Sequence, residues 1–117
     1  MSGARSYHAG LAAEEQVAQF YSRSGREVCA RRWRGTAGEI DLIARNGAEV
    51  IFIEVKQSAT HALAAEHLTP RQMARIYASA SEFLAGEPGG QLTESRFDVA
   101  LVDATGKIEI LENAFAA

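Results

Sequence analysis

The pattern of apolar and polar positions predicts a chain that alternates between helical and extended segments. Apolar residues recur at helical spacing over residues 7–24 and 70–85. Gly25 after the first range and Thr69-Pro70 before the second are typical helix-end signals. Strand patterns follow, over residues 27–33, 39–45, 49–56, 96–103 and 107–111. The order α-β-β-β-α-β-β predicts an α/β (α+β) fold, in which helices flank a mixed β-sheet.

The two central strands are joined by Arg45-Asn46-Gly47-Ala48, a segment typical of a tight type I′ turn. A turn there places Glu39 directly across from Glu54 and Asp41 diagonal to Glu54, all on one face. Val50 and Phe52 make that face apolar near the turn. The opposite face is predicted to be apolar throughout, with Ile40, Leu42, Ala44, Ile51, Ile53 and Val55.

Acidic side chains therefore gather at the far end of the hairpin, and Lys56 follows Glu54 on the same face. Facing carboxylates repel each other unless a positive charge lies between them. A hard divalent cation, Mg²⁺ (or Mn²⁺), satisfies this need, and so does the ammonium group of Lys56. The alternative is a solvated strand end with a Glu–Lys pair that contributes about 0–1 kcal/mol.

Glu14 falls inside the apolar stripe of the first predicted helix, near Val17 and Ala18 on a helical wheel. Its neighbour Glu15 points away. A carboxylate that faces the core is costly to desolvate unless it is paired or binds a metal. Two interpretations stay open: Glu14 forms a salt bridge with an arginine at the edge of the stripe, or it adds a third acid to the hairpin site.

The second predicted helix has a buried stripe that ends at Phe83 and Leu84. Its outward positions are predicted to be Arg71, Gln72, Arg75 and Ser79. A compact basic cluster, Arg31, Arg32 and Arg34, surrounds Trp33 next to the proposed site, and Arg71 and Arg75 extend it. Trp33 either stacks on an unpaired base or belongs to the core. The histidines His61 and His67 are expected in a solvated loop.

At 117 residues the chain is expected to form a single domain, 1–117. One cysteine excludes a disulfide framework, and no apolar run resembles a signal or a membrane span, so we expect a cytoplasmic protein without membrane association. The net charge of −3 is unusual for a protein that grips nucleic acid. Arginines outnumber acids in residues 1–45, however, and acids dominate residues 82–117.

The motifs resemble those of the PD-(D/E)xK nuclease superfamily, and more closely the YraN-like family of small bacterial proteins, related in fold to Holliday junction resolvases. The matching segments are Ala13-Glu14, Gly38 to Arg45, Val50 to Lys56, Leu68 to Arg71 and Arg96 to Val99. The resemblance implies a restriction-endonuclease-like fold and metal-dependent DNA cleavage, with Asp41 and Glu54-Val55-Lys56 as the signature. Resolvase-like relatives act as dimers, so a homodimer is also implied.

The chain departs from the family pattern at Gln57-Ser58, where Thr-Arg is usual, and at Gln72, where Lys is usual. A Gly-x-Pro segment of the family is replaced by residues 61–66. These changes leave the acidic residues in place but remove positive charge. They therefore put tight DNA binding in question.

Our hypothesis is a metal-dependent endonuclease that hydrolyses DNA phosphodiester bonds, with branched or junction DNA as a candidate substrate. Asp41 and Glu54 are assigned to the metal, with the Val55 carbonyl and Glu14 completing its shell. Lys56 is assigned to charge stabilisation and water positioning, and Glu39 to a second shell or second metal. Two alternatives remain. One is a non-catalytic nucleic-acid-binding module, and the other is a subunit whose acidic C-terminal third binds a protein partner.

Overall fold

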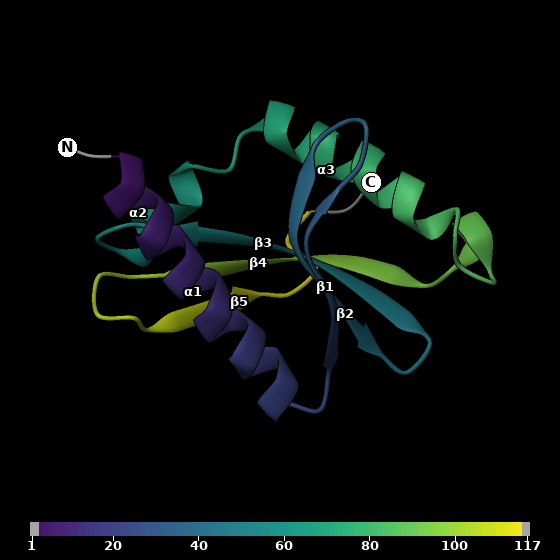
Figure 1. Cartoon of the computed structure of the whole chain (residues 1–117), viewed down its shortest axis with the longest axis horizontal. Coiled ribbons are helices and arrows are strands. Elements are labelled where there is room, and N and C mark those ends of the chain that lie inside the picture. The colour runs from purple at the N-terminus through teal and green to yellow at the C-terminus, as the bar shows by residue number, and fades with distance from the viewer. Residues whose placement is uncertain (1–2, 116–117) are drawn as a thin grey trace.

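The computed structural model describes the backbone of residues 3–115 and the side chains of residues 10–115. Its centre is a five-stranded sheet in the order β1-β2-β3-β4-β5 (Figure 1). Strands β3 and β4 run parallel, and the other neighbouring pairs run antiparallel, which confirms the predicted mixed sheet. The strands are β1 (Glu27–Arg34), β2 (Glu39–Asn46), β3 (Glu49–Gln57), β4 (Ser95–Val102) and β5 (Ile108–Leu111).

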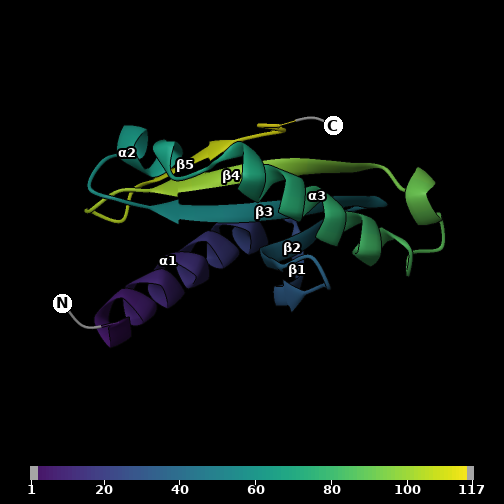
Figure 2. The same cartoon turned by 90° about the horizontal axis from the view of Figure 1, so that it is seen from above.

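Helices cover both faces of the sheet (Figure 2). Helix α1 (Gly3–Arg23) lies along one face, and α3 (Pro70–Leu84) lies along the other. Two short helices, α2 (His61–Glu66) and η1 (Gly90–Leu92), lie in the connections. Because both faces are covered, each central strand contains a continuous run of buried apolar residues: 42–44 in β2, 50–53 in β3 and 99–102 in β4. No helix in the described part of the chain is both long and apolar enough to cross a membrane.

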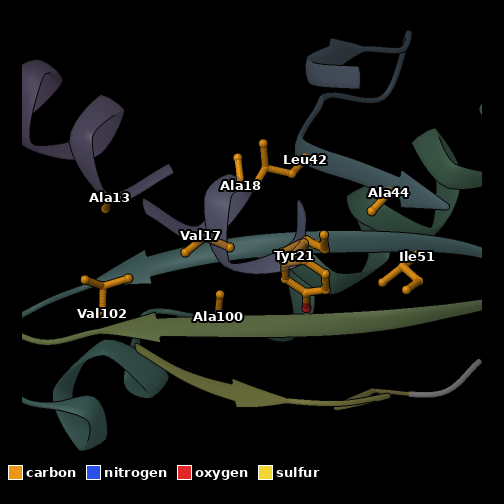
Figure 3. Packing of buried hydrophobic residues seen from close by; sticks show 10 residues of the cluster. Ala13, Val17, Ala18, Tyr21, Leu42, Ala44, Ile51, Ala100 and Val102 are labelled. Atoms are coloured by element: carbon orange, nitrogen blue, oxygen red, sulfur yellow. The ribbon is translucent and has the colours of Figure 1, made fainter. Parts of the chain in front are cut away.

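The core under α1 follows directly from the apolar stripe of that helix. Figure 3 shows Val17 and Tyr21 packed over the central strands, and both side chains are fully buried. On the opposite face, Ile76, Ala80 and Leu84 of α3 are buried against the sheet. Burying a large apolar side chain contributes roughly 1.5–3 kcal/mol, so these two faces fix where each helix lies.

The predicted register of the β2–β3 hairpin is wrong by two residues. Arg45 pairs with Val50 and Asn46 with Glu49, so the two-residue turn is Gly47-Ala48. Only Gly47 in this turn has a positive φ (64°), which is typical of a type II′ rather than a type I′ turn. A shift by two residues leaves the side chains within the β2–β3 ladder, from Leu42 onward, on their predicted faces, which is why apolar patterning could not detect the error.

The shift changes which acids face each other. The β2–β3 ladder ends at Leu42 and Ile53, and its continuation places Asp41, not Glu39, level with Glu54. Beyond this point β2 leaves the hairpin register, and Ile40 packs in the core under α3 instead of the one under α1. The expectation that Ile40 shares a face with Leu42 is therefore also wrong.

Three other expectations need correction. The segment predicted as a loop contains α2, which begins where Thr60 Oγ1 accepts a hydrogen bond from the Leu63 N–H (3.2 Å). This helix is too short for a readable apolar period, because only Ala64 is buried. His61 is not solvated as expected, since its ring lies 2.9 Å from the Lys107 carbonyl oxygen. Ser79 is fully buried rather than outward, and its hydroxyl donates to the Gly38 carbonyl (2.8 Å).

Candidate functional site: a carboxylate pair in a cleft

A cleft opens where β2 begins and β3 ends, between α1 and α3. Its volume is about 480 Å³. Five of the predicted site residues line it: Glu14, Asp41, Glu54, Val55 and Lys56. The remaining lining residues are Gly10, Ala13, Gln57 and Gln72. The spatial convergence that the sequence predicted is thus present, although a different strand register produces it.

Asp41 lies at the point where the β2–β3 ladder stops. Its Oδ2 accepts a hydrogen bond from the main-chain N–H of Val55 (2.8 Å). The side chain of one strand therefore binds the backbone of the other strand just beyond their last ladder pair. This bond holds the Asp41 carboxylate against the end of β3, beside Glu54.

Glu54 is buried, with a side chain only 7% exposed. Both of its neighbouring donors approach the same oxygen, Oε2: the side-chain amide of Gln72 at 3.1 Å and the ammonium of Lys56 at 3.4 Å. The other oxygen, Oε1, has no hydrogen-bond donor among the described residues. A buried carboxylate oxygen without a donor is costly, so a proton or a cation is needed beside it.

The pKa values of the acids reflect this crowding. Burial, followed by the negative charge of Asp41, raises the pKa of Glu54 to about 8. Burial also raises the pKa of Asp41, and the Val55 N–H partly offsets that increase. Two carboxyl groups so close together cannot both ionise cheaply. Without a cation, we expect them to share a proton.

Glu14 reaches the same cleft from α1. Its side chain is 20% exposed, and one oxygen lies 4.0 Å from Nε of Arg32. Burial and the charge of Asp41 raise its pKa to about 7. Both interpretations of Glu14 drawn from sequence therefore hold in part, because it faces the acidic site and also lies beside an arginine.

A second lobe, about 240 Å³ in volume, adjoins the first and shares Asp41, Glu54 and Gln72 with it. Glu39 lines this lobe, and one of its oxygens lies 3.4 Å from Nη2 of Arg34. Arg75 lines it from α3, together with Gly38 and Ile76. The carboxylate pair thus separates two lobes of one groove.

The predicted basic residues are distributed unevenly around this groove. Arg31 forms an ion pair with Glu15, and Arg32 adopts a positive φ of 46°, a strained conformation for a residue with a side chain. Arg71 is exposed but lines neither lobe. Trp33 packs edge-on against Phe83 with ring centroids 5.4 Å apart, which favours the core interpretation over base stacking.

Sequence reasoning missed Gln72, which it placed outward. Gln72 is half-buried and binds Glu54. Its position three residues after the helix cap at Thr69 was the available signal, because side chains in the first turn lean toward the N-terminal end of the helix.

The donor chemistry of the site fits a hard divalent cation. No three His, Cys, Asp or Glu side chains within residues 10–115 come close enough to form a closed metal cage. Mg²⁺ does not require one, since it usually keeps several waters and binds through one or two carboxylates. Asp41 and Glu54 supply those carboxylates, and Glu54 Oε1 is the oxygen that lacks a partner.

The fold and the site together define an α+β protein with a pair of carboxylates, one buried and one half-buried, in a cleft at the end of a mixed sheet. The family model described as Uncharacterised protein family UPF0102 matches residues 13–102. The chain therefore belongs to this family, the YraN family, as its motifs predicted.

Relatives in this family match nearly the whole chain. A UPF0102 protein of Cereibacter sphaeroides (strain KD131) is 74% identical over 100% of both chains. One from Ruegeria pomeroyi is 62% identical over 97% of this chain and 92% of its own. A third, from Dinoroseobacter shibae, is 43% identical over 95% of this chain and 83% of its own.

Proposed function

We propose that this protein is a metal-dependent nuclease that hydrolyses phosphodiester bonds in DNA. The observation that supports this most directly is the buried Glu54 Oε1, which has no donor among the described residues and lies beside a second, half-buried carboxylate, Asp41. A site that only stabilised the fold would be expected to pair this oxygen. A carboxylate pair with only a structural role would also lower the stability of the fold, because its charges must be removed from water.

Asp41 and Glu54 would hold Mg²⁺ (or Mn²⁺), with the Val55 carbonyl as a further oxygen donor. Glu14 would act through a bound water, because no third acid among the described residues lies close enough to complete a metal cage. When bound, the cation would polarise the scissile phosphate and lower the pKa of a bound water. Lys56, 14% exposed at its side chain, lines the same cleft and would stabilise negative charge that develops on the phosphate.

The groove would provide a path for the substrate strand. Its two lobes meet at the carboxylate pair, so a strand that crosses it has nucleotides on both sides of the cut bond. Arg75 lines the second lobe and would contact phosphate there, and Arg34 on β1 lies beside Glu39 at its rim. Glu39 would act as an outer ligand. We expect this activity in the cytoplasm, and two copies would be needed to cut two strands symmetrically.

The test compares Asp41→Asn and Lys56→Ala with the wild type on branched, flapped and linear DNA in the presence of Mn²⁺. We expect cleavage by the wild type and a loss of at least ~100-fold in both variants, as is typical when an electrostatic group is removed. Equal cleavage by all three proteins would exclude this assignment.

A non-catalytic nucleic-acid-binding module is the second candidate. The exposed side chains of Arg31 and Arg34 on β1 favour it, since they stand outside the cleft. In that case DNA binding would need no metal, would fall when Arg31, Arg32 and Arg34 are replaced, and would occur without cleavage. Binding to DNA only within a protein complex would point to the acidic C-terminal third as a docking surface instead.

A further inference from the structure

Gln72 is the one uncharged polar side chain among the described residues that donates a hydrogen bond to the carboxylate pair from α3. It lines both lobes of the groove and so lies at their junction. We propose that Gln72 is a positioning residue for the cation at Glu54, holding Oε2 so that Oε1 is presented to the ion. This inference rests on the proposed function and adds to it a residue that neither the motif nor the resemblance assigns.

The backbone of Gln72 is fixed by the start of α3. Thr69 caps the helix, and its side-chain oxygen accepts a hydrogen bond from the Gln72 N–H (3.2 Å). Pro70 follows at the first helical position, where its ring restricts φ. The half-buried Leu68 and Met73 pack into the core on either side. Gln72 therefore projects from a rigid turn rather than from a mobile loop.

The hydrogen-bond pattern at Glu54 gives the two carboxylate oxygens different roles. Gln72 Nε2 donates to Oε2 at 3.1 Å, and Lys56 approaches the same oxygen at 3.4 Å. Oε1 receives no donor from the described residues. Two donors on one oxygen set the rotation of the carboxylate about its last torsion, which is broad for glutamate when nothing restrains it.

The amide of Gln72 carries no charge, and this affects cation binding as much as its position does. The lysine that is usual at this position in the family would also hold Oε2, but it would add a second positive charge beside Lys56 and so reduce the attraction for a divalent cation. Gln72 orients Glu54 without adding positive charge to the cleft. Groups that orient metal ligands in this way typically account for 10–100-fold in metal affinity.

The experiment measures Mn²⁺ affinity by titration calorimetry for the wild type, Gln72→Met and Gln19→Met. Methionine keeps the length of the side chain but cannot donate. Gln19 is the matched control, because its amide also donates to a glutamate, Glu15, on an exposed face, and neither residue lines the cleft. We expect at least tenfold weaker Mn²⁺ binding by Gln72→Met, with an unchanged melting temperature, and wild-type affinity for Gln19→Met.

A metal-free measurement provides a second readout. The side-chain amide proton signals of Gln72 should shift in NMR spectra when Glu54 is replaced by alanine, and those of Gln19 should not. Equal Mn²⁺ affinity of Gln72→Met and wild type, or an unmoved Gln72 amide signal, would overturn the positioning role alone. Failure of the wild type to bind Mn²⁺ at all would overturn the proposed function and this inference with it.

Discussion

The hydroxyl of Tyr21 donates a 2.7 Å hydrogen bond to Oδ2 of Asp98, joining the end of α1 to the middle of β4. Both residues are fully buried. Asp98 also accepts from the Arg96 guanidinium (3.0 Å) and from the Asn113 N–H (3.0 Å), so its charge is well compensated. Glu14 lies about two helical turns before Tyr21 on the same helix. By anchoring α1 to the sheet, this bond therefore helps to position Glu14 at the cleft.

We expect Tyr21→Phe to destabilise the protein by about 1–3 kcal/mol, because it leaves a buried acceptor one donor short. Tyr77→Phe is the matched control. The Tyr77 hydroxyl is buried without a partner among the described residues, so its removal should be neutral or slightly stabilising. Urea unfolding monitored by circular dichroism measures both changes. Similar losses in the two variants would contradict the importance of the Tyr21–Asp98 bond.

Glu54→Gln should stabilise the metal-free protein at pH 8 by about 1–3 kcal/mol, since it removes a buried charge. The sign follows from the pKa of Glu54, which is about 8 in the folded chain against an ordinary value of 4.5 for a solvated glutamate. Between these values the folded state holds a proton that the unfolded state has lost, so wild-type stability falls as the pH rises from about 4.5 to 8. Thermal unfolding across this range should show a flatter pH profile for Glu54→Gln. Identical profiles for the two proteins would mean that Glu54 does not cause the fall in stability with pH.

Mn²⁺ affinity should increase with pH by up to about tenfold per unit below pH 8, because the cation must displace the proton held at Glu54. The raised pKa of Glu54, about 8, defines the upper end of this range. Titration calorimetry in buffers of different ionisation enthalpy would count the protons released. Affinity that does not vary between pH 6 and 8 would be inconsistent with binding at this carboxylate pair.

Glu14→Gln should weaken Mn²⁺ binding several-fold, since Glu14 lines the cleft and increases its negative charge. Glu15→Gln is its neighbour-matched control, because Glu15 is exposed and pairs with Arg31 outside the cleft. Both variants lose one acid from the same helix, so a general electrostatic effect would appear in both. Equal weakening in both variants would therefore mean that Glu14 has no specific role in the metal site.

Gly47→Ala should cost about 1–2 kcal/mol, because φ at Gly47 is 64°, a left-handed conformation that disfavours a side chain. Asn46→Ala should cost less, since the described positive-φ residues do not include Asn46. The comparison tests the observed turn directly, because a type I′ turn at Asn46-Gly47 would make both substitutions costly. Chemical denaturation provides the measurement.

Much of the fold was readable because its signals are local. The stripe that contains Val17 and Tyr21 predicted α1 to within a few residues, and Thr69-Pro70 predicted the start of α3. Apolar alternation assigned the faces of β2 and β3 up to Leu42. The same pattern cannot reveal a register shift of two residues, because such a shift does not change which face a side chain occupies. For that reason the pairing of Asp41 with Glu54 could not be predicted.

The sequence by itself determined the family, the mixed sheet flanked by helices, and the set of acids that gather at one end of the β2–β3 hairpin. The tertiary structure alone decided how those acids are held. It ended the ladder at Leu42 and Ile53, and it turned the Gln72 amide onto Glu54. The physical reason is that periodicity reports which face a side chain occupies, whereas a hydrogen bond between a helix and a strand depends on how the two pack in space.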